Sequence, residues 1–233
     1  MPLPLNTQIA LVTGANGGLG THVTRALLEA GATVVGVARK IEPSMAGQPL
    51  FAGISADISS IGAAKQLAEQ VAGRFGRIDI LVHLVGAFAG GKSVAETDEF
   101  TMQQMFDLNF NSAFYILRAV LPHMREARRG RIIAIGSRAA EDPGPTVGAY
   151  SASKAALVSL VRTVARENAD ANVTANVLLP GTMDTPANRQ AMPHEDFSKW
   201  VQPASVASLI VWLAGDGGKD VNGAVIPVYG VLP

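Results

Sequence analysis

A glycine-rich turn between an apolar run and a helical pattern limits this chain to few folds. Residues 9–12 (IALV) lead directly into residues 13–20 (TGANGGLG), and a helical pattern follows. A short, unbroken apolar run is typical of a parallel strand buried on both faces. Gly14 allows a tight turn, Gly18 a close approach of backbone N–H groups to a pyrophosphate, and Gly20 close packing of helix on strand. The pattern predicts a phosphate-binding turn at a helix N-terminus; the alternative is a turn without a ligand.

Strand-like runs alternate with helical patterns along the rest of the chain. Helical patterns cover residues 60–75, 97–124, 150–167 and 205–214, and strand-like runs cover residues 33–37, 50–55, 78–85, 131–135, 173–179 and 224–228. This alternation predicts an α/β fold with a doubly wound parallel sheet, that is, a Rossmann fold of three α/β/α layers. The chain has 233 residues and no internal repeat, so we expect a single domain over residues 1–233.

The composition excludes several classes of function. The formal net charge is zero, which gives no general attraction to nucleic acid or to an anionic membrane. The chain has no cysteine, which excludes disulfides, thiolate metal sites and a cysteine nucleophile, and no metal site is predicted. No apolar run approaches the length of a membrane span, and the N-terminus lacks the features of a signal peptide. We expect a soluble, cytoplasmic protein.

The end of the second strand bears on the choice of cofactor. Enzymes of this design that use NAD place Asp or Glu about 20 residues after the glycine turn, where it binds the ribose 2′-hydroxyl. Here Arg39 and Lys40 follow Ala38. Arg39 can stack on adenine and pair with a 2′-phosphate, which predicts NADP(H) over NAD(H); the alternative is two solvated cations. After the third strand, Asp57 can accept from the adenine amino group or cap the next helix.

Tyr150 and Lys154 open the helix at residues 150–167. Their spacing places both side chains on one helical face, one turn apart. A cation beside a phenol lowers the tyrosine pKa from about 10 towards neutrality, which would make Tyr150 a general acid/base. Ser137 follows the strand-like run 131–135 and can hydrogen-bond a substrate oxygen shared with Tyr150. Taken alone, Tyr-x-x-x-Lys is also typical of an ordinary surface pair.

Polar residues interrupt two otherwise regular segments. Asn109 falls in the middle of the helical pattern 97–124, where its side chain competes for backbone hydrogen bonds. We expect a local break in the helix there, with a water molecule near Lys154. His83 lies in the strand-like run 78–85, as a buried structural histidine or as a catalytic one. A basic cluster follows the helical pattern 97–124 and is either a solvated face or a docking site. It comprises Arg125, Arg128, Arg129 and Arg131.

Two apolar features point to a lid and to a partner subunit. Residues 180–200 form a long connection that holds apolar and aromatic side chains, which predicts a lid over the site. The helix at residues 150–167 is apolar on more than one face. One face must pack on the sheet, and a partner subunit is the simplest cover for the other, in a homodimer or homotetramer.

Together these residues resemble the short-chain dehydrogenase/reductase family over nearly the whole chain. The matches are Thr13-Gly14-x-x-x-Gly18-x-Gly20, Asp57 at the adenine position, Asn109, Ser137 thirteen residues before Tyr150, Tyr150-x-x-x-Lys154, and Pro180-Gly181 with Thr185. The resemblance implies a catalytic tetrad of Asn109, Ser137, Tyr150 and Lys154. It also implies cofactor contacts from Gly14, Asn16, Gly17, Gly18, Leu19, Gly20, Arg39, Asp57, Ile58, Gly86, Tyr150, Lys154, Pro180, Gly181, Thr182 and Thr185.

The tetrad roles that the resemblance implies are those of hydride transfer. A nicotinamide hydride moves to or from a carbinol carbon while Tyr150 gives or takes the hydroxyl proton. Ser137 steadies the substrate oxygen as charge develops. Lys154 lowers the pKa of Tyr150 and binds the nicotinamide ribose, and Asn109 supports a water molecule that relays protons.

The chain departs from the family pattern at two places. Members usually carry Asn-Asn-Ala-Gly after the fourth strand, whereas residues 83–86 read His-Leu-Val-Gly, so only Gly86 is retained. Contacts of the first of those asparagines therefore do not transfer to this chain. Near the C-terminus, residues 228–230 read Val-Tyr-Gly where an acidic-Gly-Gly ending is common.

The resulting hypothesis is an NADP(H)-dependent oxidoreductase, of class EC 1.1.1, that interconverts a small free carbonyl and an alcohol. A narrower alternative is reduction of 3-oxoacyl chains on acyl carrier protein, with Arg128 and Arg129 meeting an acidic carrier helix. Carrier reductases of the family tend to have a further cation before the sixth strand, and residues 168–172 (NADAN) have none. The alternative from another class is a non-catalytic dinucleotide-binding redox sensor, although such proteins usually lose the tyrosine or the lysine.

Overall fold

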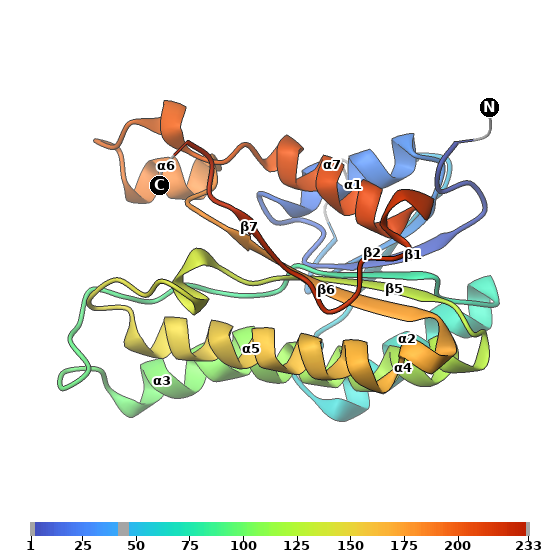
Figure 1. The fold of residues 1–233 in the computed structure, drawn as a ribbon, viewed down its shortest axis with the longest axis horizontal. Coiled ribbons are helices and arrows are strands. Elements are labelled where there is room, and N and C mark those ends of the chain that lie inside the picture. The colour runs from blue at the N-terminus through green and yellow to red at the C-terminus, as the bar shows by residue number, and fades with distance from the viewer. Residues whose placement is uncertain (1–2, 42–46, 232–233) are drawn as a thin grey trace.

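The computed structural model describes residues 3–41 and 47–231, and its centre is a seven-stranded parallel sheet (Figure 1). The strands are β1 Ile9–Thr13, β2 Thr33–Ala38, β3 Phe51–Ser55, β4 Ile80–His83, β5 Gly130–Ile135, β6 Val173–Pro180 and β7 Val225–Val228. Their order across the sheet is β3-β2-β1-β4-β5-β6-β7, and every neighbouring pair is parallel. The predicted doubly wound sheet is confirmed.

Helices cover both faces of the sheet, and each face has its own apolar core. In Figure 1, α1 (Gly20–Glu29) and α7 (Pro203–Ala214) lie above the sheet. Below it lie α2 Ile61–Phe75, α3 Glu99–Phe106, α4 Ser112–Glu126 and α5 Gly148–Glu167. The short helix α6, Pro186–Ala191, lies beyond the end of the sheet on the side of α7. Within the described ranges, no helix is both long and apolar enough to span a membrane.

The helical pattern at residues 97–124 forms three pieces rather than one helix. A π-helical turn, Asp107–Asn111, separates α3 from α4 and contains Asn109. Such turns add a residue to the helical ladder and are frequent at functional sites. The predicted break at Asn109 is confirmed, and the water molecule beside Lys154 stays a prediction.

The glycine turn after β1 has the geometry that its sequence predicts. Gly14 has a φ angle of +75°, a left-handed conformation that favours glycine, and its N–H donates to the Val37 carbonyl at 2.8 Å. A Cβ atom at Gly20 would lie 2.1 Å from the Gly14 carbonyl oxygen. Helix α1 therefore starts directly against the turn because residue 20 has no side chain.

We expect Gly20→Ala to lower the free energy of unfolding by about 3 kcal/mol, because the added methyl group displaces backbone at the turn. The matched control is Gly73→Ala in α2, where a Cβ atom would meet nothing within 4 Å. That change should leave stability unchanged or raise it by up to about 1 kcal/mol. Urea unfolding of both variants measures the difference, and equal effects would contradict the close packing described here.

Candidate active site

The predicted catalytic side chains meet at the carboxyl edge of the sheet. The strand order reverses between β1 and β4, and in doubly wound folds ligands bind at this point. Ser137 follows β5, and Tyr150 and Lys154 lie in the first turns of α5. Asn109 reaches the same region from the π-helical turn. The structure therefore brings together four side chains that are spread over 46 positions of sequence.

Asn109 is fully buried and ties three segments together. Its Nδ2 donates to the Ala87 carbonyl and to Ser153 Oγ, both at 3.0 Å, and its Oδ1 accepts from the Ala87 N–H at 2.9 Å. The loop after β4 is thereby joined to α5 next to Lys154. A Cβ atom at Gly86 would lie 2.7 Å from Asn109 Oδ1 and 3.1 Å from Lys154 Nζ. Gly86 thus lets the loop pass close to both side chains.

The pKa values of Tyr150 and Lys154 are set mainly by burial. The Lys154 ammonium is buried and donates to the Ile135 carbonyl at 2.9 Å, and burial lowers its pKa to about 8. Burial raises the pKa of Tyr150 above its usual value, and a hydrogen bond with the Ser137 side chain acts in the opposite direction. The prediction that Lys154 lowers the pKa of Tyr150 is wrong for this structure, because desolvation of the phenol dominates and the ammonium binds a backbone carbonyl. Tyr150 therefore holds its proton at neutral pH.

An exposed aromatic ring that sequence reasoning missed lies against Tyr150. The Phe88 ring meets the Tyr150 ring edge to face, with centroids 5.0 Å apart, and Phe88 remains 67% exposed. The sequence feature that could have indicated Phe88 is an aromatic residue within the glycine-rich loop after Gly86. Ser137 Oγ accepts from the Ala139 N–H at 3.2 Å, which starts the 3-10 turn Arg138–Ala140. The phenol is therefore bordered by a hydroxyl and an apolar ring.

The glycine turn fits the pyrophosphate of a dinucleotide. Helix α1 starts without a side-chain cap, so its first N–H groups are not bound by a capping side chain and suit an anion. Gly17 and Gly18 are exposed at the crest of the turn, whereas Leu19 is buried in the core. The Asn16 amide donates to the Lys40 carbonyl and so ties the turn to the end of β2.

The segment after β6 packs against this turn. A Cβ atom at Gly18 would lie 2.9 Å from the methyl carbon of Thr185. Thr185 is buried and caps α6, accepting from the Asn188 N–H at 3.3 Å. Pro180 is buried at the end of β6, and a Cβ atom at Gly181 would lie 3.0 Å from the Tyr229 carbonyl oxygen. The Thr182 carbonyl accepts from the Val201 N–H at 2.8 Å.

The residues predicted to face the adenosine half are exposed, apart from Ile58. Arg39 directly follows β2 and makes no hydrogen bond or ion pair with any residue that the structure describes. Asp57 Oδ1 accepts from the Ser59 N–H at 3.0 Å. The alternative of Asp57 as a helix cap is wrong, because α2 starts later and Ser60 is its cap. Ile58 is buried in the core.

The connection at residues 180–200 contains α6 and a 3-10 turn, Phe197–Lys199. Trp200 is only 7% exposed, so the end of the connection is anchored rather than spread over the site. Its ring lies 4.7 Å from that of Phe197, centroid to centroid. Val201 forms a bridge with Met183, which closes the segment into a loop.

The model of one protein family, described as short chain dehydrogenase, matches residues 8–196. The chain belongs to this family. A short-chain dehydrogenase is an oxidoreductase that binds a nicotinamide dinucleotide and acts on a small-molecule substrate, and the chain has the parallel sheet of this family.

Two relatives and one solved structure align with nearly the whole of this chain. The 2-dehydro-3-deoxy-D-gluconate 5-dehydrogenase of Dickeya dadantii is 31% identical over 97% of this chain and 95% of its own length. The rhamnolipids biosynthesis 3-oxoacyl-(acyl-carrier-protein) reductase of Pseudomonas aeruginosa is 32% identical over 96% of this chain and 95% of its own. The crystal structure of gox2181 is 27% identical, with a TM-score of 0.90 over 98% of this chain and 96% of that one.

His83 is a neutral residue of the core beside the site. Its Nδ1 lies 2.9 Å from Thr13 Oγ1 and its Nε2 lies 3.4 Å from Ser112 Oγ, and the ring is 1% exposed. Burial, together with the positive charge of Lys154, lowers its pKa from 6.5 to about 3. The structure thus agrees with the alternative of a buried structural histidine.

This lowered pKa predicts a loss of stability in acid. Between pH 6.5 and about 3 the unfolded chain protonates His83 while the folded chain does not. The free energy of unfolding should therefore be fully retained above pH 6.5 and fall below it, with a slope from this group of up to about 1.4 kcal/mol per pH unit. Urea unfolding across this range should show a shallower slope for His83→Met. The exposed His22→Met is the control, and equal slopes for wild type and His83→Met would contradict the assignment.

Proposed function

We propose that the protein is an NADP(H)-dependent oxidoreductase that interconverts a carbonyl and an alcohol, with Tyr150 as the general acid/base. The observation that carries this proposal is the convergence of Ser137, Tyr150 and Lys154 at the edge of the sheet where ligands bind. It is supported by the uncapped α1 turn, which lies at the same edge. The nicotinamide ring, when bound, supplies or accepts a hydride.

In the direction of reduction, the protonated Tyr150 donates its proton to the carbonyl oxygen as the carbonyl carbon gains the hydride. Because the pKa of Tyr150 is raised, the phenol is protonated before the reaction and has a proton to donate. Ser137 donates to the same oxygen while negative charge develops there. Lys154, held by the Ile135 carbonyl, supplies positive charge beside the cofactor ribose. Asn109 holds the loop after β4 in place beside α5 and so positions the Lys154 side chain.

A small free carbonyl or alcohol is the proposed substrate. Arg125 and Arg128 are engaged by the segment before β6, through the Asp170 carboxylate and the Asp170 carbonyl respectively. The charge of Arg125 is therefore paired within the chain and Arg128 is held by a backbone carbonyl, which disfavours an acidic carrier protein at this face. The name of the Dickeya relative refers to a small sugar acid, whereas that of the Pseudomonas relative refers to a carrier-bound chain.

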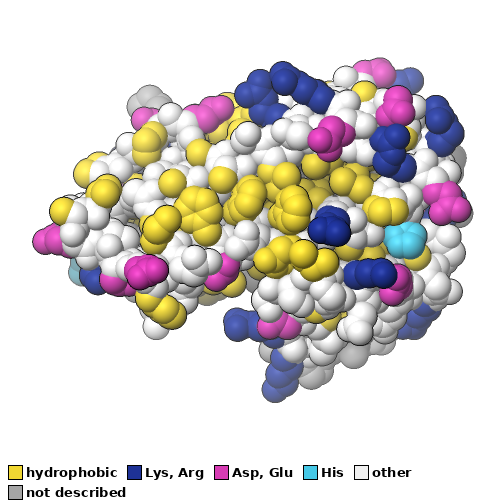
Figure 2. Space-filling view, turned by 90° about the horizontal axis from the view of Figure 1, so that it is seen from below, with side chains coloured by type: hydrophobic (Ala, Val, Ile, Leu, Met, Phe, Trp, Pro, Cys, Tyr) yellow, Lys and Arg dark blue, Asp and Glu magenta, His cyan; other side chains and the backbone are white. Residues whose placement is uncertain are grey.

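A homodimer or homotetramer is also proposed. Figure 2 shows a band of hydrophobic side chains across the face formed by the lower helices. From the end of α3, through the π-helical turn, into α4, four rings follow one another with centroids 6.2 to 6.5 Å apart: Phe106, Phe110, Phe114 and Tyr115. Phe114 is 39% exposed, and such an apolar band supports contact with a second subunit. A cytoplasmic location stays a prediction.

We expect Tyr150→Phe to lower kcat about 1,000-fold, because the proton donor is lost while the ring remains. The assay follows oxidation of NADPH over a panel of aldehydes, ketones, quinones and acyl thioesters, and fluorescence titration measures the Kd for NADPH. That Kd should change by less than about tenfold. Full turnover by Tyr150→Phe would overturn the assigned role. NADPH binding by the wild type without turnover of any substrate would favour the redox sensor.

The cofactor preference is tested at Arg39. Arg39→Asp should lower kcat/KM for NADPH about 100-fold, because a carboxylate replaces the partner of the 2′-phosphate, and should raise kcat/KM for NADH. Arg74→Asp on α2 makes the same charge change away from the site and should alter neither value by more than about twofold. A variant at Arg39 that keeps its preference for NADPH would contradict the proposal.

A further inference from the structure

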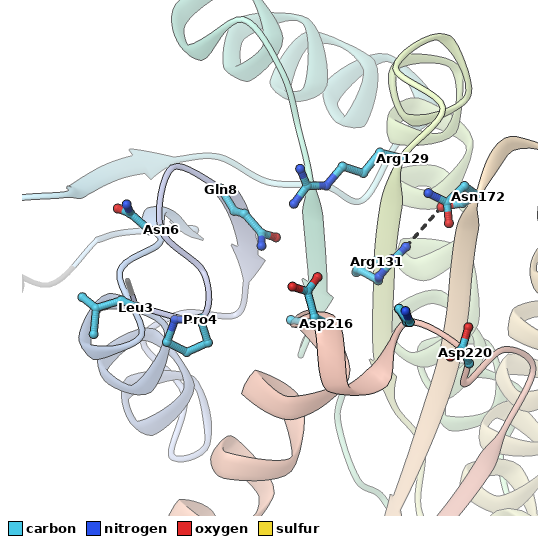
Figure 3. A pocket seen from close by; sticks show the side chains of 11 residues that line it. Leu3, Pro4, Asn6, Gln8, Arg129, Arg131, Asn172, Asp216 and Asp220 are labelled. Atoms are coloured by element: carbon cyan, nitrogen blue, oxygen red, sulfur yellow. Dashed lines mark hydrogen bonds between the residues drawn. The ribbon is translucent and has the colours of Figure 1, made fainter. Parts of the chain in front are cut away.

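A cavity lies at the amino-terminal edge of the sheet, opposite the edge that holds Tyr150 (Figure 3). Its volume is about 730 Å³, within the range of pockets that hold small molecules. Gln8 lines it just before β1, Arg129 and Arg131 at the start of β5, Asn172 just before β6, and Asp216 after α7. We call this the amino-edge cavity. It is built from segments far apart in sequence, and it has no residue in common with the candidate active site.

Gln8 gives the amino-edge cavity an unpartnered polar group. Its residue is 93% buried, as its exposed fraction is 7%, and its side-chain amide makes no hydrogen bond to any residue in the described ranges. In Figure 3 the amide points into the hollow towards Arg129 and Asp216. The amide borders the open space of the cavity and is bound by no described residue, so it is available to a ligand that can accept from its NH₂ and donate to its oxygen.

The two arginines of the amino-edge cavity differ in their partners: Arg129 Nε lies 3.8 Å from the buried Asp79 carboxylate, whereas Arg131 binds backbone carbonyls. Arg131 is 91% buried, and its NH1 atom donates to the Gly130 and Asn172 carbonyls at 2.9 and 3.1 Å. Burial and the nearby Arg129 lower the pKa of Arg131, and Asp216 and Asp220 act in the opposite direction. No ion pair within 4.0 Å joins Arg131 to a carboxylate among the residues placed by the structure. Arg131 thus lies near a second guanidinium group, and Asp216 and Asp220 line the same cavity without an ion pair to it.

This pattern specifies the chemistry of an occupant. Guanidinium groups bind carboxylates with paired, charge-assisted hydrogen bonds, and an anion between Arg129 and Arg131 relieves their repulsion. The Asp216 and Asp220 carboxylates on the other wall accept hydrogen bonds and so favour hydroxyl or ammonium groups. Lys219 adds a further cation at the rim, so the lining carries three cations and two carboxylates.

We propose that the amino-edge cavity binds a small carboxylate that also carries hydroxyl or ammonium groups. The carboxylate lies against Arg129 and Arg131, and the donor groups face Asp216 and Asp220. The Gln8 amide completes the site from the buried side. Because the cavity is at the edge of the sheet remote from Tyr150, this binding does not depend on the proposed reaction.

Isothermal titration of the full chain without cofactor tests the proposal. The probes are citrate and L-glutamate, which carry carboxylates with a hydroxyl or ammonium donor, and acetate, inorganic phosphate and glycerol as comparisons. Citrate or L-glutamate should bind saturably at one site per chain and at least about tenfold more tightly than acetate or phosphate. Absence of saturable binding of both probes up to about 20 mM, or equal binding of acetate or phosphate, would overturn it.

Variants then locate the binding. Arg129→Gln and Gln8→Met should each weaken it about tenfold or more, since each removes a group that faces the cavity. Arg128→Gln is the matched control, because it removes the same charge one residue away and does not line the cavity. The control should change the affinity by less than about twofold. Urea unfolding of each variant identifies any that fails to fold, and equal weakening by Arg128→Gln and Arg129→Gln would assign the binding to general surface charge and overturn the proposal.

Discussion

All seven strands run in one direction, and the rest of the molecule depends on this constraint. Parallel strands bring every carboxyl end to one edge and every amino end to the other. Loops from distant parts of the sequence therefore meet at both edges. At the carboxyl edge they gather a serine, a tyrosine, a lysine and a glycine turn. At the amino edge they gather arginines, carboxylates and a buried amide. The two edges differ in chemistry because different loops feed them.

At the carboxyl edge, Asn109 joins the loop after β4 to α5. A regular α-helix through residues 99–126 would turn this side chain to a different position, whereas the π-helical turn places it inside, between the Ala87 backbone and Ser153. Its hydrogen bond to Ser153 is buried and its two bonds to Ala87 are partly buried, so water competes little for them. The lysine one residue after Ser153 is thereby kept beside Ile135.

The sequence predicted the sheet, the helices and the glycine turn because these depend on local patterns: apolar period, glycine position and chain order. It also predicted the break at Asn109. It did not predict the raised pKa of Tyr150, which depends on how deeply the phenol is buried, nor the burial of Trp200. It offered Asp57 as a cap of the next helix, whereas Ser60 is the cap of α2, because serine and aspartate both suit this position and only the fold shows where the helix begins. The amino-edge cavity could not be predicted, since its lining is assembled only by the fold.

The contact between Thr185 and Gly18 has a consequence for kinetics. The methyl group of Thr185 rests on the crest of the turn so closely that no side chain fits between them. Thr185 is also the cap from which α6 and the connection at residues 180–200 begin. A molecule that occupies the turn therefore touches the same element that borders the substrate side. Two binding events that share one element are coupled, so a ligand on the turn changes the affinity of the other site and is itself bound with an affinity that the second ligand changes by the same factor.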